Sequence, residues 1–450
     1  MGYVNMKKFN KDKYLKVLRF KKYKRYLYIG IPCILVLLMG IYFAYSKFSI
    51  FKEKEVVRTT VGDFISGDVV IGAYIDGEYS KTIPGKNDGY IVDKIVCDND
   101  ASASWDNNSW GIVLTNLTKK TKCNVYFVVK PVPVVEKVTT AMSSNPSMFA
   151  ADDPEKNVRY IGKDPSNYVY FNCSDYANPT ADTCELWRII GVFNNVTKSD
   201  GSKENLVKII RDESIGNYSW DSSDSSVNDG YGVNDGYGVN DWTDADAMKL
   251  LNPGYDSVSV GGSLYYNAKS GTCYNEFKNG TTSCDFTSTG LKNDTTRNAI
   301  EEVVWNLGGV SSSSSPVSTF YTSERGTTVY TGHTTTWTGK IGLMYPSDYG
   351  YATGGSSSTS RVTCLAKELY NWDSVSDCYN NDYLFNSAYQ WTLAPKSGYA
   401  NSVFDVDSDG HVGSVTASGN FGVRPALYLK SNIQVDKGTG ESSNPYTLKF

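Results

Sequence analysis

The sequence predicts an α+β protein that begins with one transmembrane helix and continues through a small all-β sandwich into a larger domain. Three observations predict this: a long uncharged stretch near the N-terminus, β-branched runs before residue 131, and strands mixed with helices after residue 158. The expected parts are a basic cytoplasmic tail (1–26), a transmembrane anchor (27–46), an all-β domain (55–131), a linker (132–157) and an α+β domain (158–450).

The N-terminal segment has the composition of a single-pass membrane anchor. Residues 27–45 are nineteen residues without charge, long enough as a helix to reach across a hydrocarbon core of about 30 Å. Residues 1–25 hold ten Lys/Arg and one acid. This bias predicts a cytoplasmic N-terminus at the cell membrane and an extracellular location for the bulk of the chain. A cleaved signal peptide is the alternative, since Ala44-Tyr45-Ser46 resembles a cleavage motif.

Composition narrows the classes of function. The formal net charge is −4 although the first 25 residues are strongly basic. The rest of the chain is therefore acidic, which argues against a nucleic-acid partner. Only two histidines, His333 and His411, are present. Neither has a neighbouring Ser or Cys motif, and neither a G-x-S-x-G motif nor a phosphate-binding glycine loop is found, so no catalytic residue is predicted.

Eight cysteines follow the predicted anchor, and Cys33 lies within it. The eight form four couples that are local in sequence, and local pairing is the simplest of their 105 connectivities. Zinc is the alternative, but there is no C-x-x-C and no nearby His. With all eight bridged, none of them is left as a nucleophile. The predicted disulfides are Cys97–Cys123, Cys173–Cys184, Cys273–Cys284 and Cys364–Cys378.

Runs of β-branched and aromatic residues predict the strands of the all-β domain, at 69–71, 91–96 and 125–129. The larger domain is predicted to contain opening strands, three helices and closing strands. Its strands are expected at 186–193, 206–210, 403–406, 411–415 and 423–429, and its helices at 244–251, 300–307 and 365–372.

Several motifs of the larger domain resemble those of a known family. They are Trp-Arg-Ile-Ile-Gly at 187–191, Asn-Asp-Trp at 240–242 followed by a helix, Tyr-Pro-Ser at 345–347, Trp391 to Pro395, and Phe-Gly-Val-Arg-Pro-Ala-Leu at 421–427. Over about 160–450 the chain resembles an uncharacterised extracellular domain family of Gram-positive bacterial surface proteins. The order of elements is similar to C-type-lectin-like folds, including formylglycine-generating enzymes.

The resemblance implies a C-type-lectin-like domain with long disulfide-bridged loops, and it supplies no functional residue. Together with the order of elements, it predicts that strand 186–193 lies beside strand 423–429. Arg424 is expected on the opposite face of the closing strand, paired or solvated. One buried core should contain Trp187, Ile189, Val304, Leu307, Trp391, Val423 and Leu427.

One short motif indicates a metal site. Asp405, Asp407 and Asp409 followed by Gly410 have the D-x-D-x-D-G start of a calcium loop, but Thr416 occupies the position of the required Glu. A hairpin with an Asp-Gly turn is the alternative and the favoured reading. Calcium at these three carboxylates is therefore the one cofactor that the sequence suggests. A tandem Asn-Asp-Gly-Tyr-Gly-Val repeat at 228–239 is interpreted as an expanded loop.

The leading functional hypothesis is a membrane-anchored surface protein that acts as a binding or adhesion module. The 34 tyrosines, together with loops rich in Asn, Ser and Gly, have the composition of recognition surfaces. The expected partners are the membrane and an unidentified extracellular ligand, either a glycan or a protein. The alternative is an extracytoplasmic enzyme on the same fold.

Overall fold

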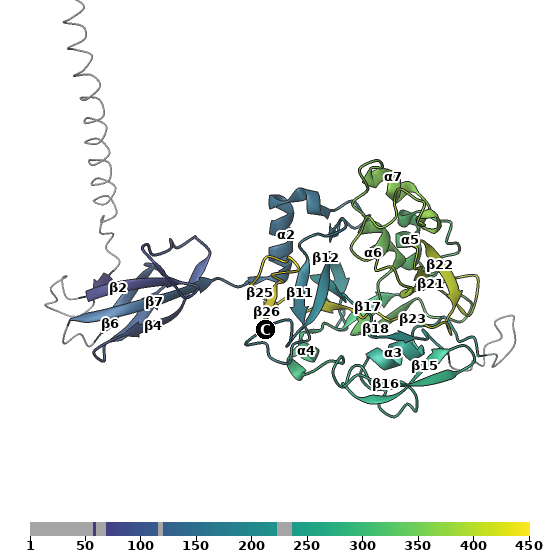
Figure 1. Cartoon of the computed structure of the whole chain (residues 1–450), viewed down its shortest axis with the longest axis horizontal. Coiled ribbons are helices and arrows are strands. Elements are labelled where there is room, and N and C mark those ends of the chain that lie inside the picture. Colours follow the sequence, from purple (N-terminus) through teal and green to yellow (C-terminus); the bar gives the residue numbers. More distant parts are fainter. Residues whose placement is uncertain (1–56, 60–68, 116–119, 223–235) are drawn as a thin grey trace, which may run out of the picture. The chain divides into compact units, whose positions relative to one another are not determined.

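The computed structural model describes residues 57–59, 69–115, 120–222 and 236–450. They belong to two compact units, Met1–Val128 and Val129–Phe450, whose described residues are shown in colour in Figure 1. The predicted anchor, Cys33 and most of the tandem repeat lie outside the described residues.

The predicted membrane anchor has no counterpart in the described part of the chain. No helix there is long and apolar enough to span a membrane. The longest, α2 (Val134–Ser144), has 11 residues, about half of what a hydrocarbon core requires. The prediction of a single-pass membrane protein is therefore corrected. The four disulfides are compatible with an extracellular location.

The prediction of an α+β fold is wrong, because the structure is mostly β, with 36% strand and 13% helix. The expected helix at 300–307 shows the reason. Helix α4 (Asp294–Ala299) ends before it, and β17 (Val303–Asn306) follows and pairs with β18 (Thr336–Gly339). Although the apolar residues have helical spacing, Val-Val-Trp favours a strand. Pairing with β18, which is distant in the sequence, makes this segment a strand instead of a helix.

The first unit consists of two sheets around a small core. One sheet has the order β1-β6-β5 and the other the order β3-β2-β7-β4, with β2 and β7 parallel. Ile112 and Leu114 of β6 pack against Val125 and Phe127 of β7. The strands are β1 (Val57–Thr59), β2 (Val69–Ile75), β3 (Glu78–Ser80), β4 (Tyr90–Cys97), β5 (Ser102–Asp106), β6 (Gly111–Thr115) and β7 (Thr121–Val129).

The second unit is organised around a seven-stranded sheet with the order β19-β24-β13-β12-β10-β9, to which β11 adds by pairing with β12. Its longest strands, β12 and β13, are antiparallel, and consecutive residues in the middle of each are buried, which means that both faces of these strands are covered. The strands are β9 (Phe149–Ala150), β10 (Val158–Tyr160), β11 (Tyr168–Phe171), β12 (Glu185–Thr197), β13 (Lys203–Arg211), β19 (Ile341–Gly342) and β24 (Ala426–Leu429).

A second sheet has the order β14-β23-β20-β21-β22, and its end is the β21–β22 hairpin. Smaller pairings are β15–β16, β17–β18 and β26-β25-β8. The strands are β8 (Val132–Pro133), β14 (Asn217–Tyr218), β15 (Ser270–Glu276), β16 (Gly280–Asp285), β20 (Gln390–Pro395), β21 (Ser402–Val406), β22 (Val412–Thr416), β23 (Phe421–Gly422), β25 (Gln434–Lys437) and β26 (Thr447–Lys449).

Short helices fill the gaps between the sheets, and α5 and α6 lie together near β21 and β22 (Figure 1). The remaining helices are α3 (Asp246–Leu251), α5 (Val317–Glu324), α6 (Pro346–Tyr351) and α7 (Arg361–Ala366), with 3-10 turns η1 (Pro146–Met148) and η2 (Leu369–Asn371). Residues 132–157, expected to be a linker, form β8, α2, η1 and β9. Val134 and Val138 of α2 are buried in the core of the second unit.

One buried core contains six of the seven residues expected there, whereas Val304 is only half-buried. The opening and closing strands share a sheet, but β13 lies between β12 and β24, so they are not neighbours.

Arg424 is 1% exposed and donates to the carbonyls of Arg211 and Leu384 and to Gln390 Oε1. It is paired within the protein rather than solvated.

Four disulfides join the cysteines in the local pairs that the spacing predicts. They are Cys97–Cys123, Cys173–Cys184, Cys273–Cys284 and Cys364–Cys378, and the Cα atoms of each pair are at most 5.9 Å apart. Cys97–Cys123 joins β4 to β7 of the first unit, across a sequence separation of 26 residues. None of the eight is a free thiol.

Replacing Cys97 and Cys123 by Ala should destabilise the first unit by about 3 kcal/mol, because the bridge restricts a long loop in the unfolded chain. Limited proteolysis of the full chain in increasing urea, read by mass spectrometry, should then show cleavage within 69–128 at lower urea. The matched control is Cys364→Ala with Cys378→Ala, which should leave cleavage within 69–128 unchanged. Equal resistance of this segment with and without its bridge would contradict the prediction.

Candidate functional site

The three carboxylates predicted as a calcium site lie on the β21–β22 hairpin. Asp405 is on β21, and Asp407 and Asp409 are in the connecting turn, where the Gly410 amide donates to the Asp407 carbonyl at 3.0 Å. Gly410 has φ of 91°, so the turn uses the freedom of glycine. The Asp-Gly turn considered as the alternative to calcium is present.

The structure adds His411 to this group. Its Nε2 is 3.3 Å from Asp407 Oδ2, and its Nδ1 contacts Asp409 Oδ1. Asp407, Asp409 and His411 each offer one atom to a group that lies within 4.8 Å. Sequence reasoning missed His411, although a hairpin register that turns at Asp409-Gly410 would have placed it opposite Asp407.

Asp405 differs from the other two aspartates because it is buried, with 3% of the residue exposed. Its Oδ1 has no hydrogen-bond partner among the described residues. Burial, followed by the nearby Asp407 carboxylate, raises the pKa of Asp405 to about 7. The structure thus holds a carboxyl group at a position that disfavours its charge.

A pocket of about 440 Å³ in the second unit is the other candidate site. It collects residues from strands β12, β13, β17 and β24 and from the ends of α5 and α6. The lining residues are Glu155, Phe193, Asn194, Asn195, Val196, Thr197, Lys203, Val304, Trp305, Asn306, Arg325, Tyr345 and Tyr428.

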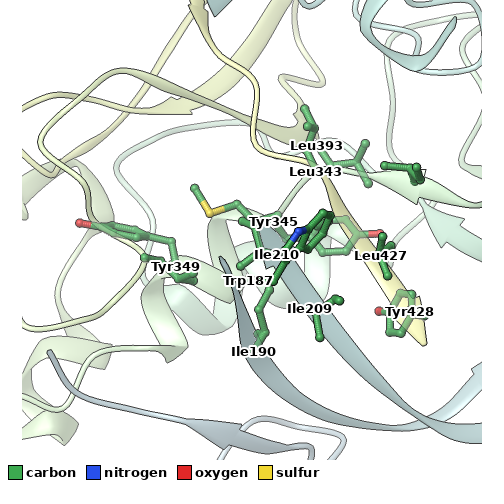
Figure 2. Close-up of a cluster of buried hydrophobic side chains, with 14 of the residues drawn as sticks. Trp187, Ile190, Ile209, Ile210, Leu343, Tyr345, Tyr349, Leu393, Leu427 and Tyr428 are labelled. Atoms are coloured by element: carbon green, nitrogen blue, oxygen red, sulfur yellow. The ribbon is translucent and has the colours of Figure 1, made fainter. Parts of the chain in front are cut away.

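Four buried aromatic residues form the floor of this pocket: Phe193, Trp305, Tyr345 and Tyr428. Figure 2 shows Tyr345 and Tyr428 among the buried side chains of β13 and β24. The Tyr345 hydroxyl donates to the Asn306 carbonyl and accepts from the Asn306 amide, both at 3.0 Å. Burial raises the pKa of Tyr345 well above its ordinary value, so the hydroxyl stays protonated at neutral pH.

A bulge in β12 forms part of the pocket rim. The register with β13 shifts between Phe193 and Val196, and Asn195 has φ of 53°. The Asn194 side chain donates to the carbonyls of Glu155 and Lys156. The bulge therefore places Asn194 and Asn195 beside the pocket and binds the loop that contains Glu155. Bulges often redirect side chains next to functional sites in this way.

Arg325, at the end of α5, closes another side of the pocket. Its guanidinium is 3.4 Å from the centroid of the Tyr321 ring, and its Nε is 3.6 Å from Glu155 Oε1. The Tyr321 hydroxyl donates to Glu155 Oε2 at 2.7 Å. Stacking and ion pairing thus fix the cation and the anion of the pocket in place.

A buried ion cluster lies directly beneath the floor. Asp348 accepts from Arg159 Nη1 at 2.8 Å and from Lys208 Nζ at 2.6 Å, and Arg159 Nε donates to Asp153 at 2.7 Å. None of the four side chains is more than 1% exposed. The adjacent cations hold the pKa of Asp348 well below its ordinary value despite its burial.

The cluster supports the floor through Lys208. Its ammonium nitrogen is 4.4 Å from the centroid of the Tyr345 ring, 5.1 Å from that of Trp305 and 5.6 Å from that of Phe193. Such contacts between a cation and aromatic rings are attractive, and more so away from water. The aromatic rings of the pocket floor are therefore held against a fixed buried charge.

Replacing Asp348 by Ala should lower the free energy of unfolding by about 3–5 kcal/mol, because Lys208 and part of Arg159 then lose their counter-charge while buried. Urea denaturation followed by circular dichroism measures this. Asp256→Ala breaks the exposed Asp256–Lys269 pair and should cost less than about 1 kcal/mol. Similar costs for the two variants would contradict the account of the cluster.

Asp405 predicts a pH dependence of stability. Because its folded pKa of about 7 exceeds the ordinary value of about 3.9, folding takes up a proton. The stabilising contribution is complete below the lower value and is lost as the pH rises through the higher one. Asp405→Asn should therefore weaken the fall in the free energy of unfolding between pH 4 and pH 8. Urea titrations at several pH values in metal chelator test this, and an unchanged slope would contradict it.

In comparisons with known proteins, one region of the chain matches a protein family. A family model described as a domain of unknown function, DUF6273, matches residues 321–431. This span contains Arg325, Tyr345 and Tyr428 of the pocket and the whole β21–β22 hairpin. No match is found among curated proteins or among solved structures. The chain thus contains a domain of unknown function, and the lectin-like part of the resemblance is not confirmed.

Proposed function

We propose that the second unit is an extracellular binding module whose pocket takes a glycan. The observation that carries this proposal is the 440 Å³ pocket with its floor of four aromatic residues and its polar rim. Ligand pockets of this size combine apolar surface with a few fixed polar groups. Sugars offer the complement, since their C–H faces pack on aromatic rings and their hydroxyls hydrogen-bond to amides and charged groups.

The polar groups of the rim suit a neutral, hydroxyl-rich ligand. Asn194, Asn195 and Asn306 supply amide groups. Arg325 and Glu155 supply a donor and an acceptor that form an ion pair, and Arg325 also contacts the buried Glu324 carboxylate. A strongly charged ligand would have to separate that pair. The four disulfides support function in an oxidising environment outside the cell.

The pocket supports binding better than glycoside hydrolysis. Hydrolysis commonly requires two carboxyl groups on either side of the scissile bond. Among the described residues that line the pocket, Glu155 is the single acid. Both of its oxygens are engaged, one by Tyr321 and the other by Arg325. A binding role therefore needs fewer assumptions than the enzyme considered as the alternative.

Asn306→Ala tests the proposal with little structural cost. The bonds between Asn306 and Tyr345 use the Asn306 backbone, so the variant removes an amide from the rim and leaves these bonds in place. A glycan array probed with the full chain should identify a ligand, and isothermal titration with it should show about tenfold weaker binding by the variant, the effect of one lost hydrogen bond.

Lys269→Ala is the control, because it removes an exposed side chain that does not line the pocket. It should bind the array ligand as tightly as the unchanged chain. Binding of no glycan by the full chain would overturn the proposal, and so would a ligand that Asn306→Ala and Lys269→Ala bind equally well.

A further inference from the structure

The β21–β22 hairpin carries aspartate and histidine side chains, types that can bind metal ions, on one of its faces. Asp405 pairs with Gly413, and Val406 pairs with Val412. The Asp407 amide donates to the His411 carbonyl at 2.8 Å, which continues the same register. Because side chains alternate between the faces of a strand, Asp405, Asp407, His411 and Gly413 share one face.

Hydrogen bonds orient the His411 ring on this face. Asp409 Oδ1 contacts Nδ1, and this carboxylate can accept the Nδ1 proton. The neutral ring then presents an unprotonated Nε2 toward Asp407, whose Oδ2 is 3.3 Å away. A carboxylate on one nitrogen that leaves the other free is the usual arrangement of a metal-binding histidine.

Asp405 supplies an independent indication of a cation site. Its Oδ1 is buried and lacks a hydrogen-bond partner among the described residues. A Cβ built on Gly413 would lie 3.3 Å from Asp405 Oδ1 and 3.6 Å from His411 Nε2. The unpartnered oxygen and the imidazole nitrogen thus converge on the space left by the missing side chain of residue 413.

The groups around this space provide no compensating positive charge. In the described part of the chain, Asp407 and Asp409 contact no basic side chain except the His411 imidazole, and Asp405 forms no ion pair. The Tyr389 hydroxyl is hydrogen-bonded to Asp407, and the Tyr370 ring packs on His411 at 5.2 Å between centroids. The carboxylates of Asp407 and Asp409 and the buried carboxyl group of Asp405 therefore face one imidazole, and a bound cation would balance their negative charge.

We infer that His411 Nε2 and Asp407 hold a divalent transition-metal ion such as Zn²⁺, with Asp409 positioning the imidazole. These three residues are the group whose ligand atoms lie within 4.8 Å of one another, and the buried Asp405 carboxyl group faces the same space without belonging to that group. One nitrogen and carboxylate oxygens suit zinc and similar ions, whereas calcium binds oxygen ligands almost exclusively. The site therefore differs from the calcium loop that the three aspartates alone suggested. Asp407 and His411 are partly exposed, which gives an ion access from solvent.

Isothermal titration of the full chain with ZnCl₂ at neutral pH, after treatment with chelator, tests this site. One Zn²⁺ should bind per chain, and Co²⁺ should give visible absorption bands of a site with a nitrogen ligand. His411→Gln should abolish this binding. Asp409→Asn should weaken it about 10- to 100-fold, the usual effect of removing a group that orients a ligand. Gly413→Ala should weaken it as well, since the added Cβ fills the space.

His333→Gln is the matched control, because it removes the only other histidine of the chain, and it should bind Zn²⁺ normally. Circular dichroism identifies any variant that fails to fold, and the Co²⁺ spectrum of the unchanged chain is independent of the variants. The inference is overturned if neither Zn²⁺ nor Co²⁺ binds, if His411→Gln binds as well as His333→Gln does, or if Ca²⁺ binds in preference to Zn²⁺.

Discussion

The ionic contacts of Asp348 with Arg159 and Lys208 are the interaction on which the second unit depends most. They join α6 to β10 and β13, three elements that are far apart in the sequence. Burying these charges is costly, and the cost is offset only while every partner remains in place. The same carboxylate accepts the backbone amide of Tyr345 at 3.0 Å and so begins α6. A local helix start and a long-range tertiary contact thus share one side chain.

This cluster explains why a pocket exists at this point of the molecule. An ammonium group cannot be covered by ordinary aliphatic packing without loss, but aromatic rings can surround it favourably. Phe193, Trp305, Tyr345 and Tyr428 surround Lys208 on one side and line the pocket on the other. The residues that stabilise the buried charge are therefore the same residues that would contact a ligand.

Features that depend on neighbouring residues could be predicted from the sequence, whereas contacts between distant segments could not. The strands at 186–193 and 206–210 and the local disulfide pairs depend on short patterns, and the structure contains them. The helix expected at 300–307 failed because β17 finds its partner in β18, some thirty residues away. Similarly, the aspartates at 405–409 form a motif that can be recognised in the sequence. The position of His411 beside them depends on the hairpin register, which the motif does not contain. The pocket joins segments near 155, 193, 305, 325, 345 and 428, which no local pattern connects.

A double-mutant cycle between Lys208 and Asp348 tests the central claim most directly. The free energies of unfolding of Lys208→Met, Asp348→Asn and the double variant are compared with that of the unchanged chain in urea. If the buried pair holds the second unit together, the single changes will be far from additive, with a coupling of about 2–3 kcal/mol. A coupling below about 0.5 kcal/mol, within the range of independent sites, would contradict the account.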